Sequence, residues 1–153
     1  MALPKTQTRV IECTREEDNR RIRRELEARV WYFAGHPDLI DGRLEELDAE
    51  WDIERVLLTQ AAGVSLFGAL MASRNHRWLI LPFAVGGFLM QHALQGWCPP
   101  VPLWRRLGVR TTSEIDAERC ALKALRGDFD AARSDLGLEE KVEAALNVAG
   151  QRL

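Results

Sequence analysis

The chain has 153 residues, a formal net charge of −2 at pH 7 and a hydrophobic content of 46%. The length suits one compact unit, and the near-neutral charge gives no reason to expect nucleic-acid binding. The first 13 residues lack the apolar core of a secretory signal peptide. Three scattered cysteines, Cys13, Cys98 and Cys120, argue against a disulfide framework and for reduced thiols in a cytosolic setting.

The first predicted helix follows residues 1–13, which we expect to be disordered or extended. Thr14 and Glu17 form a Thr-x-x-Glu capping box, and the helix that it opens should run to about Phe33. Its charged face mixes both signs, so we interpret that face as solvated rather than as a basic patch for lipid or RNA. Its apolar stripe consists of Ile22, Leu26, Val30 and Phe33.

A second amphipathic helix should begin near Pro37, which suits a first helical turn. No Gly, Pro or Ser-rich linker interrupts residues 50–56, so we expect this helix to continue directly into the apolar segment that follows. Residues 14–55 can form an antiparallel helical hairpin, or one stripe can pair with a second copy of the chain. The second stripe consists of Ile40, Leu44, Leu47 and Trp51.

The next segment is defined by a lack of acids, because no Asp or Glu occurs from Arg55 to Ser113 although the chain contains 23 of them. This segment holds two apolar runs, residues 56–73 and 78–97, which contain no charged side chain. A helix needs about 20 apolar residues to cross the hydrocarbon core. We therefore predict a two-span transmembrane hairpin over residues 56–97. The alternative is a soluble bundle with two buried helices, which usually keep a polar stripe.

Polar side chains near one end of each run predict a contact between the spans. Gln60 lies about 6 Å into the first run, and Gln91, His92 and Gln95 lie at a similar depth in the second. We expect Gln60 to form a hydrogen bond across the pair, with a ligand or proton-relay role for His92 as the alternative. The predicted interfacial anchors are Trp51, Trp78, Trp97 and Trp104.

The turn after the second run, Gly96–Pro102, contains three prolines that end the helix. We expect it to display Cys98 at the cytosolic membrane surface near Arg105 and Arg106, whose charge would favour the thiolate. Cys98 is therefore the candidate reactive thiol. His92 and Cys98 are reasonable ligand types for haem or a metal, but two ligands fall far short of a site, and we predict no cofactor and no metal.

The C-terminal region, residues 98–153, is predicted to be helical and cytosolic. A second Thr-x-x-Glu box, Thr111 to Glu114, should open a helix over about 113–125 that ends at Gly127. A final helix is expected over 138–148. The predicted fold class is therefore all-α, with a two-helix transmembrane hairpin flanked by amphipathic cytosolic helices.

Several motifs together give this chain a family resemblance. They are Glu50–Arg55, Gln91–Pro99, Leu107–Thr111, Glu114–Ile115 and Leu125–Phe129. With its Gly-x-Cys-Pro and following Leu-Gly step, the chain resembles the YgaP-like inner-membrane domain family, a group largely of unknown function. The resemblance covers about residues 48–130 and implies a two-span hairpin in a bacterial inner membrane. Some members carry a fused rhodanese sulfurtransferase domain, for which this chain has too few residues outside the hairpin.

Basic residues near the spans predict the orientation of the hairpin. Five lie on the side of the termini and two in the connecting loop, which favours a cytoplasmic location of both termini. The five are Arg43, Arg55, Arg105, Arg106 and Arg110, and the two are Arg74 and Arg77.

Two functions compete on this evidence. The first is a small integral membrane protein that serves as an anchor or assembly module, with the lipid bilayer and either a second copy or a membrane protein as partners. The second is a sulfur- or redox-handling membrane protein that uses Cys98. Because His36, His76 and His92 are dispersed and lie near no nucleophile, we expect no enzyme of the hydrolase or transferase class.

Overall fold

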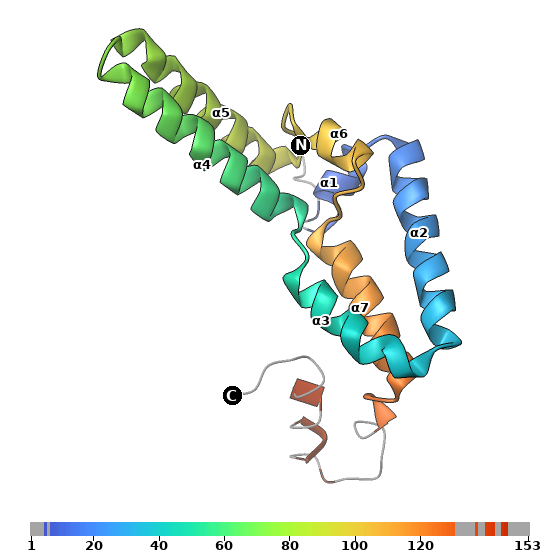
Figure 1. Cartoon of the computed structure of the whole chain (residues 1–153). Coiled ribbons are helices and arrows are strands. Elements are labelled where there is room, and N and C mark those ends of the chain that lie inside the picture. The colour runs from blue at the N-terminus through green and yellow to red at the C-terminus, as the bar shows by residue number, and fades with distance from the viewer. Residues whose placement is uncertain (1–4, 6, 131–136, 138–139, 143–144, 147–153) are drawn as a thin grey trace. The chain divides into compact units, whose positions relative to one another are not determined.

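The computed structural model of this protein describes residue 5, residues 7–130, residue 137, residues 140–142 and residues 145–146. Every regular element in these residues is a helix, which confirms the all-α prediction (Figure 1). The chain divides into two compact units, residues 1–24 with 51–115 and residues 25–50 with 116–153. Helices α2 (Glu16–Ala34) and α7 (Thr112–Arg126) contribute residues to both units. The predicted helix 138–148 lies largely outside the described residues.

The most extended part of the first unit is a helical hairpin. Helices α4 (Ile53–Ala72) and α5 (Ile80–Gln95) lie side by side and are joined by the 3-10 helix η2 (His76–Leu79) (Figure 1). Gly68 allows their close approach, because a Cβ atom there would lie 2.8 Å from the Pro82 ring. Among the described residues one stretch, Pro37–Ala72, contains an 18-residue window of mean hydropathy 1.4 that is long and apolar enough to cross a membrane. The part of this stretch that is poor in charge is α4.

The expected continuous helix from the second amphipathic segment into the first apolar run is wrong. Helix α3 (Ile40–Ala49) ends at Glu50, whose backbone is extended, and α4 begins after Asp52. The Asp52 carboxylate accepts a hydrogen bond from the Arg55 backbone N–H at 2.8 Å and so caps α4. The backbone N–H of Ile53 donates to the Arg110 carbonyl at 2.9 Å. A cap and a long-range backbone contact therefore stabilise the break, and Trp51 lies outside both helices.

The N-terminal expectation also needs correction. Residues 9–12 form a short helix, α1 (Arg9–Glu12), and Val10 is buried. Helix α2 begins at Glu16, but Thr14 does not cap it, because the Thr14 hydroxyl donates to the Val10 carbonyl at 2.7 Å. The Thr-x-x-Glu pattern was therefore misleading here: the hydroxyl stabilises the end of α1 instead of the start of α2.

The core of the first unit lies where α1, α4 and the turn after α5 meet. It extends to helix α6 (Val101–Arg106), and Trp104 and Val109 pack against it. Its buried residues are Val10, Ile53, Leu57, Cys98 and Val101.

The second unit contains the C-terminal half of α2, the 3-10 helix η1 (Pro37–Leu39), α3 and most of α7. Ile40, Leu47 and Leu122 are almost completely buried. Glu118 is also fully buried, and its carboxylate binds Arg29 of α2 at 3.1 Å and Arg43 of α3 at 2.9 Å. A charged contact thus joins all three helices.

The limits of α7 agree with the sequence. The backbone N–H of Thr111 donates to Glu114 Oε2 at 2.8 Å, and the Glu114 backbone N–H donates to the Thr111 hydroxyl at 3.3 Å. This reciprocal pair is the predicted capping box. At the other end Gly127 has φ +87° and the Asp128 N–H donates to the Lys123 carbonyl, so the predicted glycine stop is confirmed.

Replacement of Glu118 tests the charged contact in the second unit. Glu118→Gln keeps the size of the side chain but leaves Arg29 and Arg43 without their shared carboxylate. We expect the free energy of unfolding to fall by about 3 kcal/mol, the lower end for breaking a buried pair, because both arginines remain partly exposed. The measurement is denaturant unfolding of the full chain in mild detergent, followed by circular dichroism.

The matched control is Asp116→Asn in the same helix, because Asp116 forms an exposed pair with Arg119. Such pairs contribute at most about 1 kcal/mol. Equal destabilisation by the two substitutions would show that Glu118 does not hold the unit together.

Candidate functional site

A partly buried cluster of polar and charged side chains stands at the base of the hairpin. His92 of α5 is buried, and its Nε2 lies 3.0 Å from Oε2 of Glu54 in the first turn of α4. Oε1 of Glu54 accepts a hydrogen bond from Arg9 of α1 at 2.8 Å. Because a carboxylate can only accept, His92 donates from Nε2. One carboxylate therefore joins α1, α4 and α5.

Gly96 completes this junction, because the chain of α1 lies directly against it. Gly96 ends α5 with φ +78°, a conformation that favours glycine. A Cβ atom there would lie 2.5 Å from the backbone carbonyl of Arg9. The Cys13 thiol also donates to the Gln95 carbonyl at 3.2 Å. The N-terminal helix is thus held on the C-terminal end of α5 by two kinds of contact.

Cys98 follows Gly96 by two residues, and the expectation that it is displayed at a surface is wrong. Its side chain is buried within the core of the first unit, with 5% relative exposure. Burial raises the pKa of the Cys98 thiol above its ordinary value. The predicted thiolate is therefore disfavoured, because Arg105 points its guanidinium to other partners and burial dominates the environment of the sulfur.

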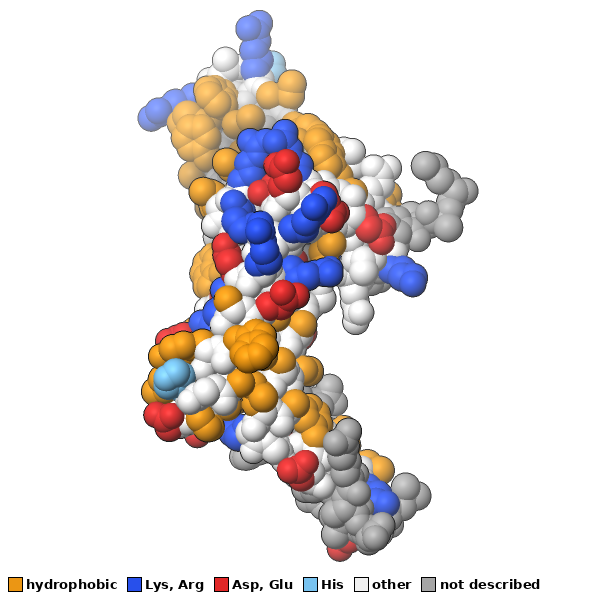
Figure 2. All heavy atoms as spheres, turned by 90° about the vertical axis from the view of Figure 1, so that its right-hand side faces the viewer, with side chains coloured by type: hydrophobic (Ala, Val, Ile, Leu, Met, Phe, Trp, Pro, Cys, Tyr) orange, Lys and Arg blue, Asp and Glu red, His pale blue; other side chains and the backbone are white. Residues whose placement is uncertain are grey.

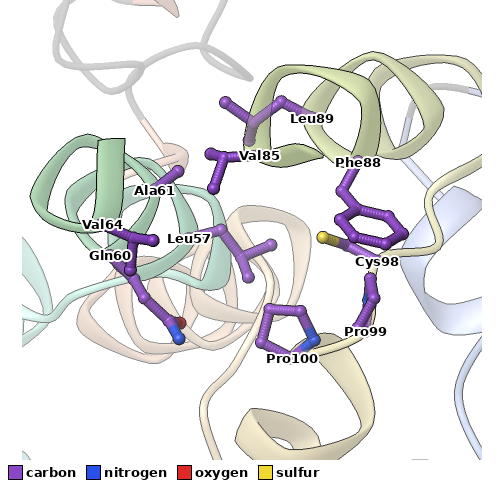
Figure 3. Close-up of a pocket in the computed structure, with 10 residues that line it drawn as sticks. All are labelled: Leu57, Gln60, Ala61, Val64, Val85, Phe88, Leu89, Cys98, Pro99 and Pro100. Carbon is purple, nitrogen blue, oxygen red and sulfur yellow. The ribbon is translucent and has the colours of Figure 1, made fainter. Parts of the chain in front are cut away.

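A cavity of about 170 Å³ opens beside Cys98 between the two hairpin helices. Figure 3 shows the sulfur pointing into it between Leu57 and Phe88. Most of its lining is apolar. The ten lining residues are Leu57, Gln60, Ala61, Val64, Val85, Phe88, Leu89, Cys98, Pro99 and Pro100.

The predicted hydrogen bond of Gln60 across the spans does not form. Gln60 Oε1 instead accepts from the Trp104 indole N–H at 2.9 Å, while His92 pairs with Glu54. Gln91 is half-buried, and Gln95 contributes its backbone carbonyl rather than its side chain to the junction. A polar contact between the two helices therefore exists. The partner of His92 in this contact is Glu54 and not Gln60, which the sequence had suggested.

The four predicted anchor tryptophans occupy different environments. Trp51, Trp78 and Trp97 are exposed by 47%, 40% and 37%, and Trp104 is half-buried. Arg55 stacks its guanidinium 4.4 Å from the Trp51 ring, and Trp78 meets Phe67 edge to face. Their role as membrane anchors stays a prediction.

The role of Arg105 is the principal feature of this site that the sequence did not predict, because the residue was expected near Cys98 at a surface. Arg105 is fully buried, and its guanidinium forms two hydrogen bonds with Glu114 at 2.6 and 2.8 Å. It also donates to the Val109 carbonyl and to Asn19 Oδ1. Burial raises the pKa of Glu114, but the hydrogen bonds from Arg105 and Thr111 outweigh it, so this pKa lies below its usual 4.5. The Thr111–Glu114 box was the only sequence signal near this site.

Within the described residues, no group of three or more His, Cys, Asp or Glu side chains is arranged to hold a metal ion. His92 directs Nε2 to Glu54, so its pairing with Cys98 as a ligand set gains no support from this geometry. Comparison of the chain with protein-family models, curated proteins and solved structures found no match. The YgaP-like resemblance therefore stays a prediction that rests on its motifs.

Substitution of Gly96 tests the docking of α1. Gly96→Ala introduces a methyl group into the space of the Arg9 backbone and places a non-glycine residue at positive φ. A cost of about 1–2 kcal/mol should loosen α1 and raise the rate of maleimide labelling of Cys13 about tenfold. Peptide mass spectrometry of the labelled full chain distinguishes Cys13 from Cys120.

Gly108→Ala is the control, because Gly108 also has positive φ, at +87°, but a Cβ atom there meets nothing within 4 Å. It shares the backbone strain without the clash, and we expect Cys13 labelling to stay within about twofold of the unsubstituted chain. A Cys13 rate that Gly96→Ala leaves unchanged would contradict the proposed packing.

The depressed pKa of Glu114 predicts a pH dependence. Because the folded pKa lies below the unfolded one, the carboxylate stabilises the fold above about pH 4.5, and this contribution is lost as the pH falls through the folded value. Glu114→Gln should therefore lower the Tm most at pH 7, and the difference from the unsubstituted chain should shrink below about pH 4.5. Thermal unfolding in detergent between pH 3 and 7 measures it. A gap that does not change with pH would contradict the ion pair.

Proposed function

We propose that this protein is a small integral membrane protein whose hairpin crosses a bilayer twice and whose other helices form an assembly module at one surface. The observation that carries the proposal is the apolar side chains exposed around α4 and α5. A contiguous apolar surface of this kind is rare on a protein in water. The most exposed of these residues are Leu58, Leu66, Phe67, Leu70, Ile80, Phe83, Met90 and Leu94.

The lengths of the helices support two crossings. The 20 residues of α4 extend about 30 Å, which matches the hydrocarbon core. The 16 residues of α5 extend about 24 Å, and the last two residues of η2, Trp78 and Leu79, add about 4 Å. Residues 78–95 contain no charged side chain and together extend about 28 Å, close to the same thickness.

The orientation that we propose places both termini in the cytoplasm of a bacterium and the loop 74–77 outside. The support is the excess of arginines flanking the spans over the two in the loop. The YgaP-like motifs support the inner membrane as the location.

The proposed assembly role rests on the exposed aromatic residues of the second unit. Trp31 is exposed by 82% and Tyr32 by 52%, whereas Glu118 of the same unit is fully buried. These two aromatic side chains are therefore not part of the core of that unit. Large aromatic side chains are enriched where proteins meet other proteins. They support contact with a second copy or with a membrane protein. The burial of Cys98 gives no support to the sulfur-handling alternative.

A charged substitution on the exposed face of the hairpin tests the membrane location. Leu66→Asp with Met90→Asp places two carboxylates where we expect lipid, at a cost of about 2.5–3.5 kcal/mol for each near a span centre. We expect the unsubstituted chain to stay in the membrane fraction after alkaline carbonate extraction and the double variant to be largely released. Trp31→Asp is the control, because Trp31 is more exposed than either residue but lies outside the hairpin.

Cysteine labelling of intact cells tests the orientation. A cysteine at position 75, introduced by Asn75→Cys, should react with a membrane-impermeant maleimide from the outer side of intact cells, whereas Cys120 should react only after lysis. Release of the unsubstituted chain by carbonate would overturn the membrane proposal. Labelling of Cys120 in intact cells would reverse the orientation only.

A further inference from the structure

The first half of α2 carries a basic face. Arg20, Arg23 and Arg24 are exposed and, with Glu17, line a hollow of about 420 Å³. Positions 17, 20, 23 and 24 share one side of a helix, because residues three and four apart are neighbours. Figure 2 shows that Lys and Arg side chains gather on this side of the molecule.

The acids of α2 neutralise this face only in part. Glu16 pairs with Arg20 at 3.1 Å, and Asp18, which is buried, pairs with Arg21 at 3.4 Å. Arg23 and Arg24 form no ion pair with any residue that the structure describes. One arginine of the face, Arg20, is therefore paired, whereas the guanidinium groups of Arg23 and Arg24 have no carboxylate partner among the described residues.

Hydrogen bonds hold this part of α2 to the segment that follows the hairpin. Arg21 donates to the carbonyls of Arg105 and Arg106 at 3.0 and 2.8 Å, and Arg105 donates to Asn19 at 2.9 Å. Helix α6, which contains both arginines, begins at Val101, five residues after the glycine that ends α5. The basic face and the end of the second span therefore belong to one unit, and Arg106, whose carbonyl accepts from Arg21, is itself exposed.

We propose that the basic face of α2, formed by Arg20, Arg23 and Arg24, binds anionic phospholipid headgroups of the leaflet that the hairpin enters. This inference rests on the proposed membrane location. Guanidinium groups bind phosphate oxygens through paired hydrogen bonds, and juxtamembrane basic residues are attracted to anionic leaflets. Charge complementarity and the tie to the end of the hairpin select lipid over other anions. The face orients the cytosolic helices on the membrane surface.

A fluorescent label within the hollow tests this directly. The full chain carries Cys13→Ser and Cys120→Ser, and a bimane is attached after Glu17→Cys, or after Asn75→Cys in a second preparation. Both are reconstituted into vesicles of phosphatidylcholine alone or with phosphatidylglycerol, each with a trace of headgroup spin-labelled lipid. We expect quenching at position 17 to be at least about threefold stronger with phosphatidylglycerol and to weaken in high salt.

Two matched variants assign the effect to the basic face. Arg23→Gln with Arg24→Gln should remove the preference for phosphatidylglycerol at position 17. Arg74→Gln with Arg77→Gln removes the same charge from exposed residues of the connecting loop and should keep the preference. Neither pair holds an ion pair with a described residue, so both variants should retain the helical circular dichroism of the parent.

The label at position 75 distinguishes failure of this inference from failure of the membrane location. Quenching at 75 in both vesicle types together with equal quenching at 17 overturns the lipid site alone. No quenching at 75 overturns the membrane location and the lipid site with it. Protection of the position-17 label from iodide by RNA, but not by anionic vesicles, also overturns the proposal, because it identifies a nucleic-acid partner.

Discussion

Two carboxylates at the borders of the acid-free stretch determine how the first unit is built. Glu54 is the last acid before the hairpin and Glu114 is the first acid after it. Glu54 holds Arg9 and His92, and Glu114 holds the fully buried Arg105. A buried guanidinium is strongly unfavourable without a partner, and the segment between these two acids has none to offer. The acid-free stretch is thus held in place at each end by a carboxylate that lies just outside it.

This arrangement connects the hairpin to the rest of its unit. Through Glu54 the base of α4 contacts both α1 and the last turn of α5, and Gly96 permits the close approach of α1. Through Arg105 the segment after the hairpin contacts the start of α2 and the cap of α7. The turn that carries Cys98 lies between these two contacts, so the thiol is enclosed by packing. The prolines after it shape one wall of an apolar cavity rather than a display site.

Local sequence signals predicted what local contacts determine. The reciprocal cap of Thr111 and Glu114 and the stop at Gly127 were correct because each depends on residues within one turn. The identical Thr-x-x-Glu pattern at Thr14 failed because a closer carbonyl, that of Val10, took the hydroxyl. The break before Asp52 could not be predicted, because a backbone carbonyl more than fifty residues away stabilises it.

The same limit explains the site. Residue depth along the two apolar runs suggested that Gln60 and His92 would meet, and depth alone says nothing of side chains brought in from α1 or α6. Trp104 reaches Gln60, and Glu54 reaches His92, from positions that no periodicity relates to them. The burial of Cys98 likewise depends on Val10 and Ile53, which the sequence places far from the proline turn.

The two units use their apolar residues differently from an ordinary soluble protein. Much of the apolar surface of α4 and α5 faces outward, and comparatively few large apolar side chains are fully buried in the described residues. Contacts between carboxylates and guanidinium groups help to hold the helices of each unit together. These contacts join Glu114 to Arg105 in the first unit and Glu118 to Arg29 and Arg43 in the second. The contact between Glu114 and Arg105 depends on an ionised carboxylate, so its stabilising contribution is lost as the pH falls through the lowered folded pKa of Glu114. The apolar packing between α4 and α5 involves no titrating group, so acid weakens the attachment of α7 and α2 to the segment after the hairpin before it affects that packing.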